Sequence, residues 1–231
     1  ANLLRAISHD LRTPLTGIIG NSSLFLESQN DLSSTEQRTI MTNIYEDSNW
    51  LLNMVENLLS VTRIQGDSLS INTTEEPVEE VVGEALEKLK KRYPDAAIRV
   101  KIPEEFLMIP MDAVLIEQVT INLLENAIVH SGSILPIDFI VEDHPEHVSF
   151  IVRDYGKGLS EEKLQNLFET GTYNNSRSSD SRKGMGIGLS ICKTIITAHH
   201  GTLNGRNHAE GAEFCFTLPK NTGKDMDHRN E

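Results

Sequence analysis

The chain has 231 residues, of which 38% are hydrophobic, and 21 basic against 34 acidic residues give a formal net charge of -13. This composition suits one large or two small soluble domains. The acidity, uninterrupted by any segregated basic patch, argues against binding to nucleic acid or anionic lipid by charge. Cys192 and Cys215 lack metal-ligand spacing and cannot build a disulfide framework, so we expect core thiols in a reducing compartment.

Membrane segments and targeting signals are not expected in these residues. No apolar run approaches the roughly 18 residues that would span a bilayer. The first residues also lack the charged and then apolar pattern of a signal peptide. We therefore expect a cytoplasmic chain. Because the helical pattern starts almost at Ala1, we interpret it as a fragment whose sensory or membrane-anchored part lies upstream.

A seven-residue repeat runs through residues 2–28 and predicts a long packing helix. Its first seam position holds Leu4, Leu11, Ile18 and Phe25, and its second holds Ser8, Leu15 and Ser22.

A second heptad pattern follows a polar turn at Asn30 and Asp31. Ser33 and Glu36 have the spacing of a capping box, which predicts a helix start there. The predicted seam of this second helix consists of Met41, Ile44, Ser48, Leu51, Val55, Leu58 and Thr62. Two such helices form a hairpin whose apolar stripe would be buried in a dimeric four-helix bundle. Alternatively, the hairpin packs on the rest of its own chain.

The pattern changes near residue 69 and predicts an α+β sandwich with helices on one side of a mostly antiparallel sheet. Helices are expected at 78–92, 112–131, 160–168 and 189–199, and strands at 98–102, 135–141, 148–152, 201–204 and 212–218. We expect a dimerisation and phosphotransfer domain at 1–68, a catalytic domain at 69–220 and a mobile polar tail at 221–231. A flexible joint is expected at residues 65–68.

His9 lies one position outside the seam of the first helix, where its imidazole would face water as a nucleophile. Asp10 beside it can accept the Nδ1 proton and leave Nε2 free to attack phosphorus. Thr13 lies one turn further along, and Pro14 should bend the helix there. A lone histidine on a helix usually has no role, so the surrounding string Ser-His-Asp-Leu-Arg-Thr-Pro-Leu matters more than His9 alone.

Three further motifs follow. Asn122 and Asn126 are four residues apart in a helical pattern, so their amides share one face and could hold hydrated Mg²⁺ with its phosphates. Asp154, with Gly156 and Gly158, follows an apolar strand and could accept the exocyclic amine of adenine where the glycines allow close approach. Each motif alone also fits a polar helix face or a common tight turn.

Glycines at 184, 186 and 188 precede Leu189 and a predicted helix, an arrangement that presents free backbone N–H groups to phosphate. They follow a polar loop at 172–183, which we interpret as a lid over a ligand. A dinucleotide fold is rejected, because its glycines would follow an early strand directly.

Together and in this order, the four motifs resemble the H, N, G1 and G2 boxes of sensor histidine kinases of the HisKA class over nearly the entire chain. The resemblance implies a dimeric helical hairpin and a Bergerat-type ATP-binding sandwich that use ATP and Mg²⁺. It implies the following roles: His9 as phospho-acceptor, Asp10 as base, Thr13 in dephosphorylation of the partner, Asn126 on Mg²⁺, Asn122 near the phosphates, Asp154 on adenine, and Gly184, Gly186, Gly188 and Leu189 at the base of the lid.

Within that class, six stretches resemble a potassium-responsive subfamily in its Gram-positive form. They read SHDLRTPLTGI, ENLLSVTRI, EEPVEEVVGEAL, PMDAVLIEQV, INLLENAI and KGMGIGLSICKTI. The subfamily implies homodimerisation, a membrane-anchored full-length sensor and a response-regulator receiver domain as phosphoryl acceptor.

The chain departs from the family pattern at two places. Val129 replaces a common lysine or arginine that contacts phosphate, although His130 and Arg182 could compensate. The F box is eroded, because Thr170 and Gly171 follow Phe168 where a second phenylalanine usually stands. Two other functions therefore stay open: a non-catalytic ATP-binding dimeric scaffold, and an ATPase like gyrase, Hsp90 or MutL, against which the H box argues.

Overall fold

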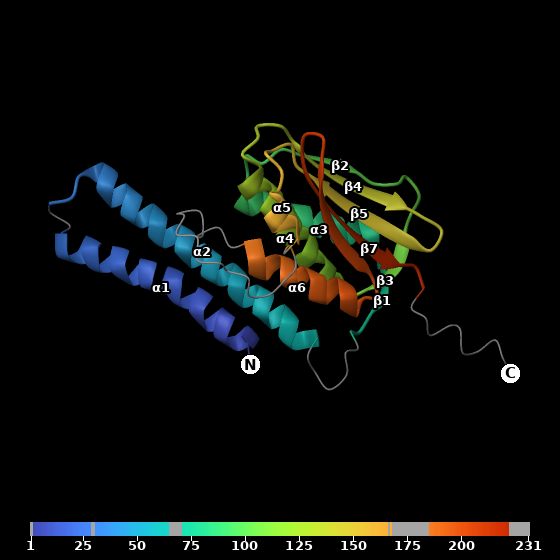
Figure 1. Cartoon of the computed structure of the whole chain (residues 1–231), viewed down its shortest axis with the longest axis horizontal. Coiled ribbons are helices and arrows are strands. Elements are labelled where there is room, and N and C mark those ends of the chain that lie inside the picture. Colours follow the sequence, from blue (N-terminus) through green and yellow to red (C-terminus); the bar gives the residue numbers. More distant parts are fainter. Residues whose placement is uncertain (1, 29–30, 65–70, 166, 168–184, 222–231) are drawn as a thin grey trace. The chain divides into compact units, whose positions relative to one another are not determined.

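The computed structural model describes residues 2–28, 31–64, 71–165, 167 and 185–221, with the side chains of 2–10, 53, 56–64 and 185–187 left out (Figure 1). The chain divides into two compact units, Ala1–Ser60 and Val61–Glu231, which are described separately. The predicted joint at 65–68 and most of the predicted tail lie outside the described residues. No helix in the described parts is long and apolar enough to cross a membrane.

The first unit is an antiparallel hairpin of α1 (Asn2–Ser28) and most of α2 (Ser34–Ile64), whose last four residues fall in the second unit. Helix α1 continues through Pro14. The predicted capping box is confirmed at the start of α2, because the Ser33 amide donates to Glu36 Oε2 at 2.8 Å and the Glu36 amide donates to Ser33 Oγ at 3.3 Å. The Ser33 hydroxyl, which donates to Glu36 Oε2 at 2.6 Å, and then the Ser33 amide hold the pKa of Glu36 below its usual value.

The two helices approach closely at Gly17, where a Cβ atom would lie 2.4 Å from Asp47 Oδ2. A side chain at this position would therefore require the Asp47 carboxylate to move. Among the described side chains of the hairpin, the apolar ones that are buried are Pro14, Ile40 and Met54, and the last two each lie one position before a predicted seam residue. The seam residues Met41 and Val55 are themselves exposed in the single chain.

The second unit contains a five-stranded sheet with the order β2-β4-β5-β7-β6 and a two-stranded sheet of β1 and β3. Only the β2–β4 pair is parallel among the paired strands described. The large sheet consists of β2 (Ile98–Lys101), β4 (Ile137–Asp143), β5 (His147–Arg153), β6 (Thr202–His208) and β7 (Gly211–Pro219), and the small one of β1 (Thr74–Pro77) and β3 (Met108–Met111).

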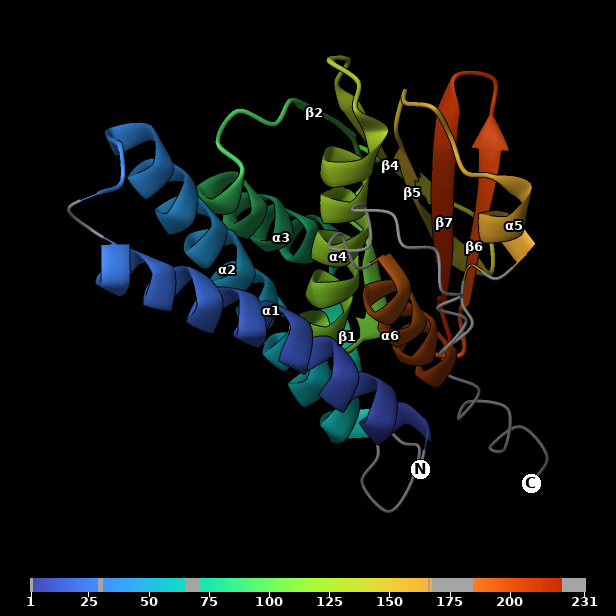
Figure 2. The same cartoon turned by 60° about the vertical axis from the view of Figure 1, so that its left-hand side comes forward.

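Helices α3 (Val78–Arg92), α4 (Ala113–Ser131) and α6 (Met185–Ala198) cover one face of the large sheet, and the short α5 (Glu161–Gln165) lies near β6 (Figures 1 and 2). The predicted α+β sandwich is therefore confirmed. Helix α3 has the predicted ends, and Asp112 caps α4 by accepting the Leu115 amide at 3.1 Å.

Several details differ from the prediction. Helix α5 covers only Glu161–Gln165 of the predicted 160–168, and β4 begins at Ile137 where 135 was predicted. The strands β1 and β3 were not expected, because both are only four residues long and each contains a proline. The predicted start of the last helix at Leu189 is wrong, since α6 begins at Met185. Gly186 and Gly188 therefore lie inside the first turn of a helix, whose free amides need no glycine-specific backbone conformation.

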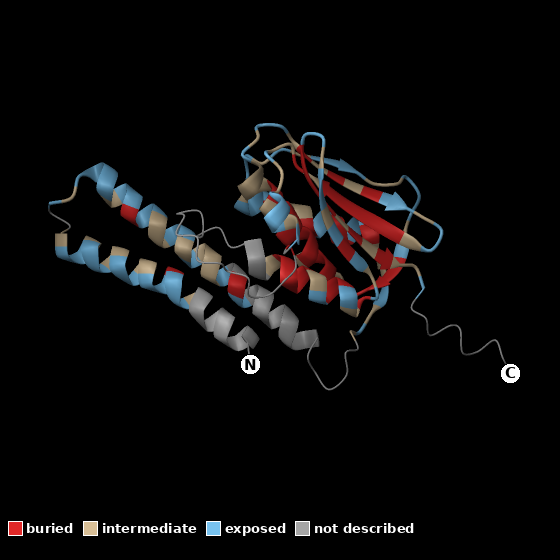
Figure 3. Cartoon of the chain, viewed as in Figure 1, coloured by how far each residue is buried: buried red, intermediate tan, exposed pale blue. Residues whose placement is uncertain are grey.

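The core fills the space between the helices and the large sheet (Figure 3). Phe150 and Phe216 stack there with ring centroids 4.5 Å apart. Helix α4 is apolar on most sides because it packs against α3, α6 and the sheet at once. Cys192 belongs to this core, where burial raises the pKa of its thiol to about 12, and Cys215 is partly buried; both are free thiols.

Candidate functional site

The predicted nucleophile lies on α1. His9 and Asp10 are helical residues whose side chains lie outside the described set. Thr13 follows His9 by four residues, so the two lie on the same face of the helix, and Thr13 is exposed. The first unit thus presents the H-box positions on one continuous helix.

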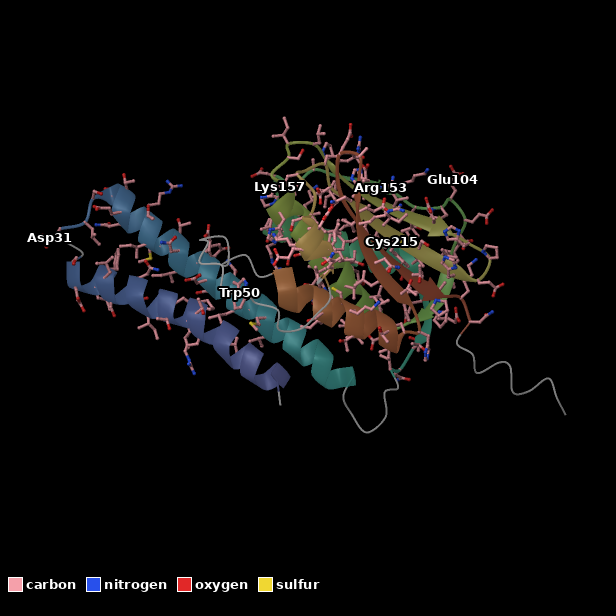
Figure 4. All side chains as sticks on the ribbon, in the orientation of Figure 1. Asp31, Trp50, Glu104, Arg153, Lys157 and Cys215 are labelled. Carbon is pink, nitrogen blue, oxygen red and sulfur yellow. The ribbon has the colours of Figure 1, made fainter. Side chains whose placement is uncertain are left out.

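The second unit contains a pocket between α4, the loop after β5 and the start of β7. It is lined by Asn126, Val129, His130, Gly132, Asp154, Lys157, Gly158, Leu159, Lys163, Ala212 and Phe214. Figure 4 labels Lys157 of this pocket and Arg153 on the strand that leads to it. The N box and the G1 box, 28 residues apart between Asn126 and Asp154, therefore meet at one cavity.

Asp154 is the buried carboxylate of this pocket, with 7% of its surface exposed. Its Oδ1 accepts hydrogen bonds from the Gly156 amide at 2.9 Å and from the Ala212 amide at 3.3 Å. Its own amide donates to the Ala212 carbonyl at 2.9 Å. Both hydrogen bonds that the described residues make to the carboxylate go to Oδ1, so Oδ2 is the oxygen placed to receive a donor from a ligand.

Three glycines allow the chain to close around Asp154. A Cβ atom at Gly156 would lie 2.1 Å from the Ser131 carbonyl oxygen, and one at Gly211 would lie 2.1 Å from the Asp154 carbonyl oxygen. Gly158 has a φ of +70°, in the left-handed region that glycine adopts without strain. A side chain at position 211 would therefore displace Asp154 itself, and one at position 156 would push the loop away from the end of α4. Gly211 was not predicted from the sequence.

A side-chain clamp fixes the loop after Asp154. The Asn207 side chain accepts from the Leu159 amide at 2.8 Å and donates to the Leu159 carbonyl at 2.7 Å. Sequence reasoning missed Asn207, because no local motif indicates a contact between residues 48 positions apart.

The pocket wall formed by α4 contains Asn126, Val129 and His130, as the resemblance implied for the first and the last. Asn122 is not among the described lining residues. It is 6% exposed, and its Nδ2 lies 3.7 Å from Cys192 Sγ on α6 while its Oδ1 accepts from Gln118 at 3.3 Å. In this conformation Asn122 ties α4 to α6.

The G2 box is described only in part. Arg182 and Gly184 lie outside the described residues, as does the whole loop that we interpreted as a lid. Gly188 is half-buried in α6, and Leu189 is a core residue with 1% exposure. The described part of this box therefore contributes the start of a helix and its anchoring in the core.

The residues present fit a magnesium nucleotide. Asp154 offers a buried acceptor for a base amine, Asn126 offers an amide oxygen of the kind that Mg²⁺ takes together with water, and Lys157, Lys163 and His130 bring donors for phosphate. The pocket thus has a carboxylate for one part of the ligand and cationic side chains for another.

Two family models match the chain. Residues 1–67 match the His Kinase A (phospho-acceptor) domain, and residues 111–222 match the family described as histidine kinase-, DNA gyrase B-, and HSP90-like ATPase. The chain belongs to the HisKA class of sensor histidine kinases and comprises the two domains of their core.

Among its relatives, the chain is similar to the sensor protein KdpD. It is 43% identical to that of Clostridium acetobutylicum over 95% of this chain, and 34% identical to that of Escherichia coli over 99%. It spans 25% of the length of each. The structure of the histidine kinase ThkA in complex with the response regulator protein TrrA has the same fold, with a TM-score of 0.70 and 24% identity over 97% of this chain and 63% of that one.

Proposed function

We propose that this chain is a protein-histidine kinase that phosphorylates His9 from Mg·ATP and passes the phosphoryl group to an aspartate of a response regulator. The observation that carries the proposal is the pocket around Asp154, a buried carboxylate with one oxygen fixed by two amides and the other available to a base. The H-box helix on the same chain supplies an acceptor for the phosphoryl group.

Each pocket residue has a role in this proposal. Asp154 accepts the 6-amino group of adenine, and the cationic side chains Lys157, Lys163 and His130 neutralise phosphate oxygens. Asn126 would hold Mg²⁺, which would offset the negative charge of the ATP phosphates. Asn122 supports Asn126 from the helix turn before it, through its contact with Cys192. Arg182 and the glycines of the G2 box complete the phosphate contacts.

The chemistry at His9 is an in-line displacement. The Nε2 of the neutral imidazole forms a bond to the γ-phosphorus, the bond from that phosphorus to the bridging oxygen breaks, and ADP leaves. The Nδ1 proton passes to Asp10, which keeps the phosphoimidazole neutral at the ring. The phosphoryl group then moves from His9 to the regulator's aspartate.

Hydrolysis by a gyrase-like ATPase fits the pocket less well. Such an enzyme needs a base that activates water beside the phosphates. Among the described lining residues the only carboxylate is Asp154, whose Oδ1 already accepts two amides. A pocket of this kind favours holding ATP until an external nucleophile reaches it, and His9 is that nucleophile.

Dimerisation is part of the proposal. A second apolar stripe, separate from the buried Ile40 and Met54, runs along each helix of the hairpin. It consists of Leu15, Ile19 and Leu26 on α1 and of Met41, Tyr45, Leu52 and Val55 on α2, with exposures from 45% to 77%. A second copy of the hairpin would cover these stripes in a four-helix bundle.

The similarity to KdpD extends the proposal to partner and setting. We propose a KdpE-like regulator as acceptor, control of potassium transport as the output, and a membrane-anchored longer protein that holds this part in the cytoplasm. Thr13, exposed one turn after His9, would assist dephosphorylation of the regulator. Accordingly, Thr13→Ala should leave autophosphorylation intact and prolong the life of the phosphorylated regulator.

The deciding experiment is incubation of the purified chain with Mg·[γ-³²P]ATP. We expect label that survives alkali and is lost in acid, and that is absent from His9→Gln. Asp154→Asn should abolish both label and ATP binding, while His144→Gln, a matched control at a histidine outside the pocket, should keep both. If ATP binds and no label forms, the chain is a non-catalytic scaffold.

A further inference from the structure

A row of alternating charges crosses all five strands of the large sheet. Arg99, Asp138, Arg153, Glu213 and Arg206 face one another in consecutive pairs of the strand register. Arg99 Nε donates to Asp138 Oδ1 at 2.6 Å, and Arg206 Nε donates to Glu213 Oε1 at 2.7 Å. Because each neighbour has the opposite sign, the row fixes the strands to one another at this end of the sheet.

Tyr155 attaches the nucleotide loop to this charge row. Its hydroxyl donates to Asp138, and the Arg99 guanidinium carbon lies 5.8 Å from the centre of its ring. Neighbouring residues of an extended chain point to opposite sides. The side chain of Tyr155 is therefore held on the side of the charge row, whereas the preceding Asp154 lines the pocket.

His208, at the end of β6, holds Asp154 from the same side. Its Nε2 lies 2.8 Å from the Asp154 carbonyl oxygen, and its ring meets that of Tyr155 edge-on with centroids 5.6 Å apart. The Glu210 amide donates to His208 Nδ1 at 3.4 Å, so the proton of the neutral ring lies on Nε2 and is donated to Asp154. His208 itself is not among the described residues that line the pocket.

We propose that His208 and Tyr155 are positioning residues for Asp154, which together with the charge row set the carboxylate to receive the 6-amino group of adenine. This inference rests on the proposed function, in which Asp154 contacts that group. The backbone hydrogen bond from His208 and the side-chain link from Tyr155 restrain the two ends of the same dipeptide, so the pocket-facing carboxylate has little freedom to turn.

The test compares two nucleotides that differ only at the 6-position. Dissociation constants of the full chain are measured with Mg²⁺ for ATP and for purine riboside triphosphate, which lacks the 6-amino group. The variants are His208→Ala, His208→Gln, which keeps an N–H donor, and Tyr155→Phe, which loses only the hydroxyl. His144→Ala, in the turn between β4 and β5, is the matched control.

Removal of the His208 donor should weaken ATP binding about three- to tenfold, as expected for one hydrogen bond, and should leave binding of the analogue within about twofold. The preference for the 6-amino group therefore shrinks, which a general loss of structure would not produce. His208→Gln should recover most of the preference, Tyr155→Phe should lose about half of it on a logarithmic scale, and His144→Ala should match the wild type.

Equal weakening of both nucleotides by His208→Ala would overturn the positioning role, and so would a full preference for the 6-amino group kept by His208→Ala or by Tyr155→Phe. If the wild-type chain binds both nucleotides equally, Asp154 does not contact the 6-amino group and the base contact in the proposed function fails too. Thermal unfolding without nucleotide identifies a variant that does not fold. In that case Tyr155→Phe, which keeps the aromatic ring, decides the question by its ratio of the dissociation constants for the two nucleotides.

Discussion

In the hairpin, the apolar side chains buried among the described residues are Pro14, Ile40 and Met54, whereas the sandwich buries a continuous cluster around Phe139, Phe150 and Phe216. The hairpin leaves other apolar side chains half in water, as at Ile19 with 59% exposure. Since apolar burial is the main stabilising term in folding, the sandwich has what it needs within one chain. The hairpin does not, and it is the unit that a second copy would complete.

The first way to test this difference is to damage the core of the sandwich. Phe216 is fully buried and stacks on Phe150, so Phe216→Ala should lower the free energy of unfolding by about 3–5 kcal/mol. The measurement is urea unfolding of the chain. Phe106→Ala is the control, because Phe106 is 74% exposed and should cost less than about 0.5 kcal/mol. If both substitutions lowered the free energy of unfolding by similar amounts, the buried core around Phe216 would not be what stabilises the sandwich.

The second test charges the outer stripe of the hairpin. Ile19→Glu combined with Leu52→Glu would place carboxylates where we expect a second copy to pack, at side chains with 59% and 54% exposure. The dimer should dissociate about 100-fold more readily, because an unpaired charge is costly to bury. Sedimentation equilibrium measures this change. ATP binding should be unaffected, since the pocket lies wholly in the sandwich.

Thr39→Glu is the matched control for that experiment. Thr39 is exposed on α2, two residues before Met41 and hence on nearly the opposite side of the helix. This variant should dimerise like the wild type. If it dissociates as readily as the double variant, charge in general, and not the stripe, controls association.

The third test uses pH and concerns the sandwich alone. His199 is buried, its Nε2 accepts the Asp112 amide at 3.0 Å, and its Nδ1 donates to the Ile195 carbonyl at 2.8 Å. Burial lowers its pKa below the usual value. The unfolded chain therefore binds the proton more readily, so stability is complete above the ordinary pKa and falls as pH drops from there toward the lowered pKa.

One such group gives a slope of up to about 1.4 kcal/mol per pH unit below a pH of roughly 6.5. Urea unfolding at several pH values should show this slope in the wild type and in His144→Gln, the control at a more exposed histidine. In His199→Gln the slope should be smaller by that amount. Identical slopes in all three proteins would remove His199 as the cause.

The two units also differ in how far their sequence predicts them. Local patterns found both hairpin helices, the Ser33 cap and helix α3 with its ends, because periodicity and capping depend on residues a few positions apart. The motifs also located Asp154, Asn126 and His130, which the fold brings to one pocket. Their ordered spacing, more than any single residue, made the resemblance specific.

What the sequence did not reveal depends on distant contacts. Nothing near Asn207 or Gly211 indicates that they support the Asp154 loop, since strand pairing alone brings β6 and β7 beside it. The charge row is likewise invisible until the strand register is known. The predicted seam residues Met41 and Val55 are exposed in the single hairpin, where Ile40 and Met54 are buried, because a heptad pattern cannot tell contacts within a hairpin from those between two copies.

The smallest expected effect returns to the hairpin and asks how much of it forms without a partner. In the capping box, Ser33 and Glu36 satisfy the amides of each other at the start of α2. Ser33→Ala leaves one of these amides without its acceptor and should destabilise the hairpin by about 1 kcal/mol. Ser34→Ala, one residue further on, should be nearly neutral, because Ser34 begins the helix outside the box. Helix content followed by circular dichroism during thermal unfolding measures both.

In the charged Ile19→Glu and Leu52→Glu background, the same cap substitution should melt a larger share of the helix, because a single hairpin depends more on its local interactions than a bundle does. An equal loss in both backgrounds would mean that the hairpin is stable alone, and the contrast between the two units would then be one of degree.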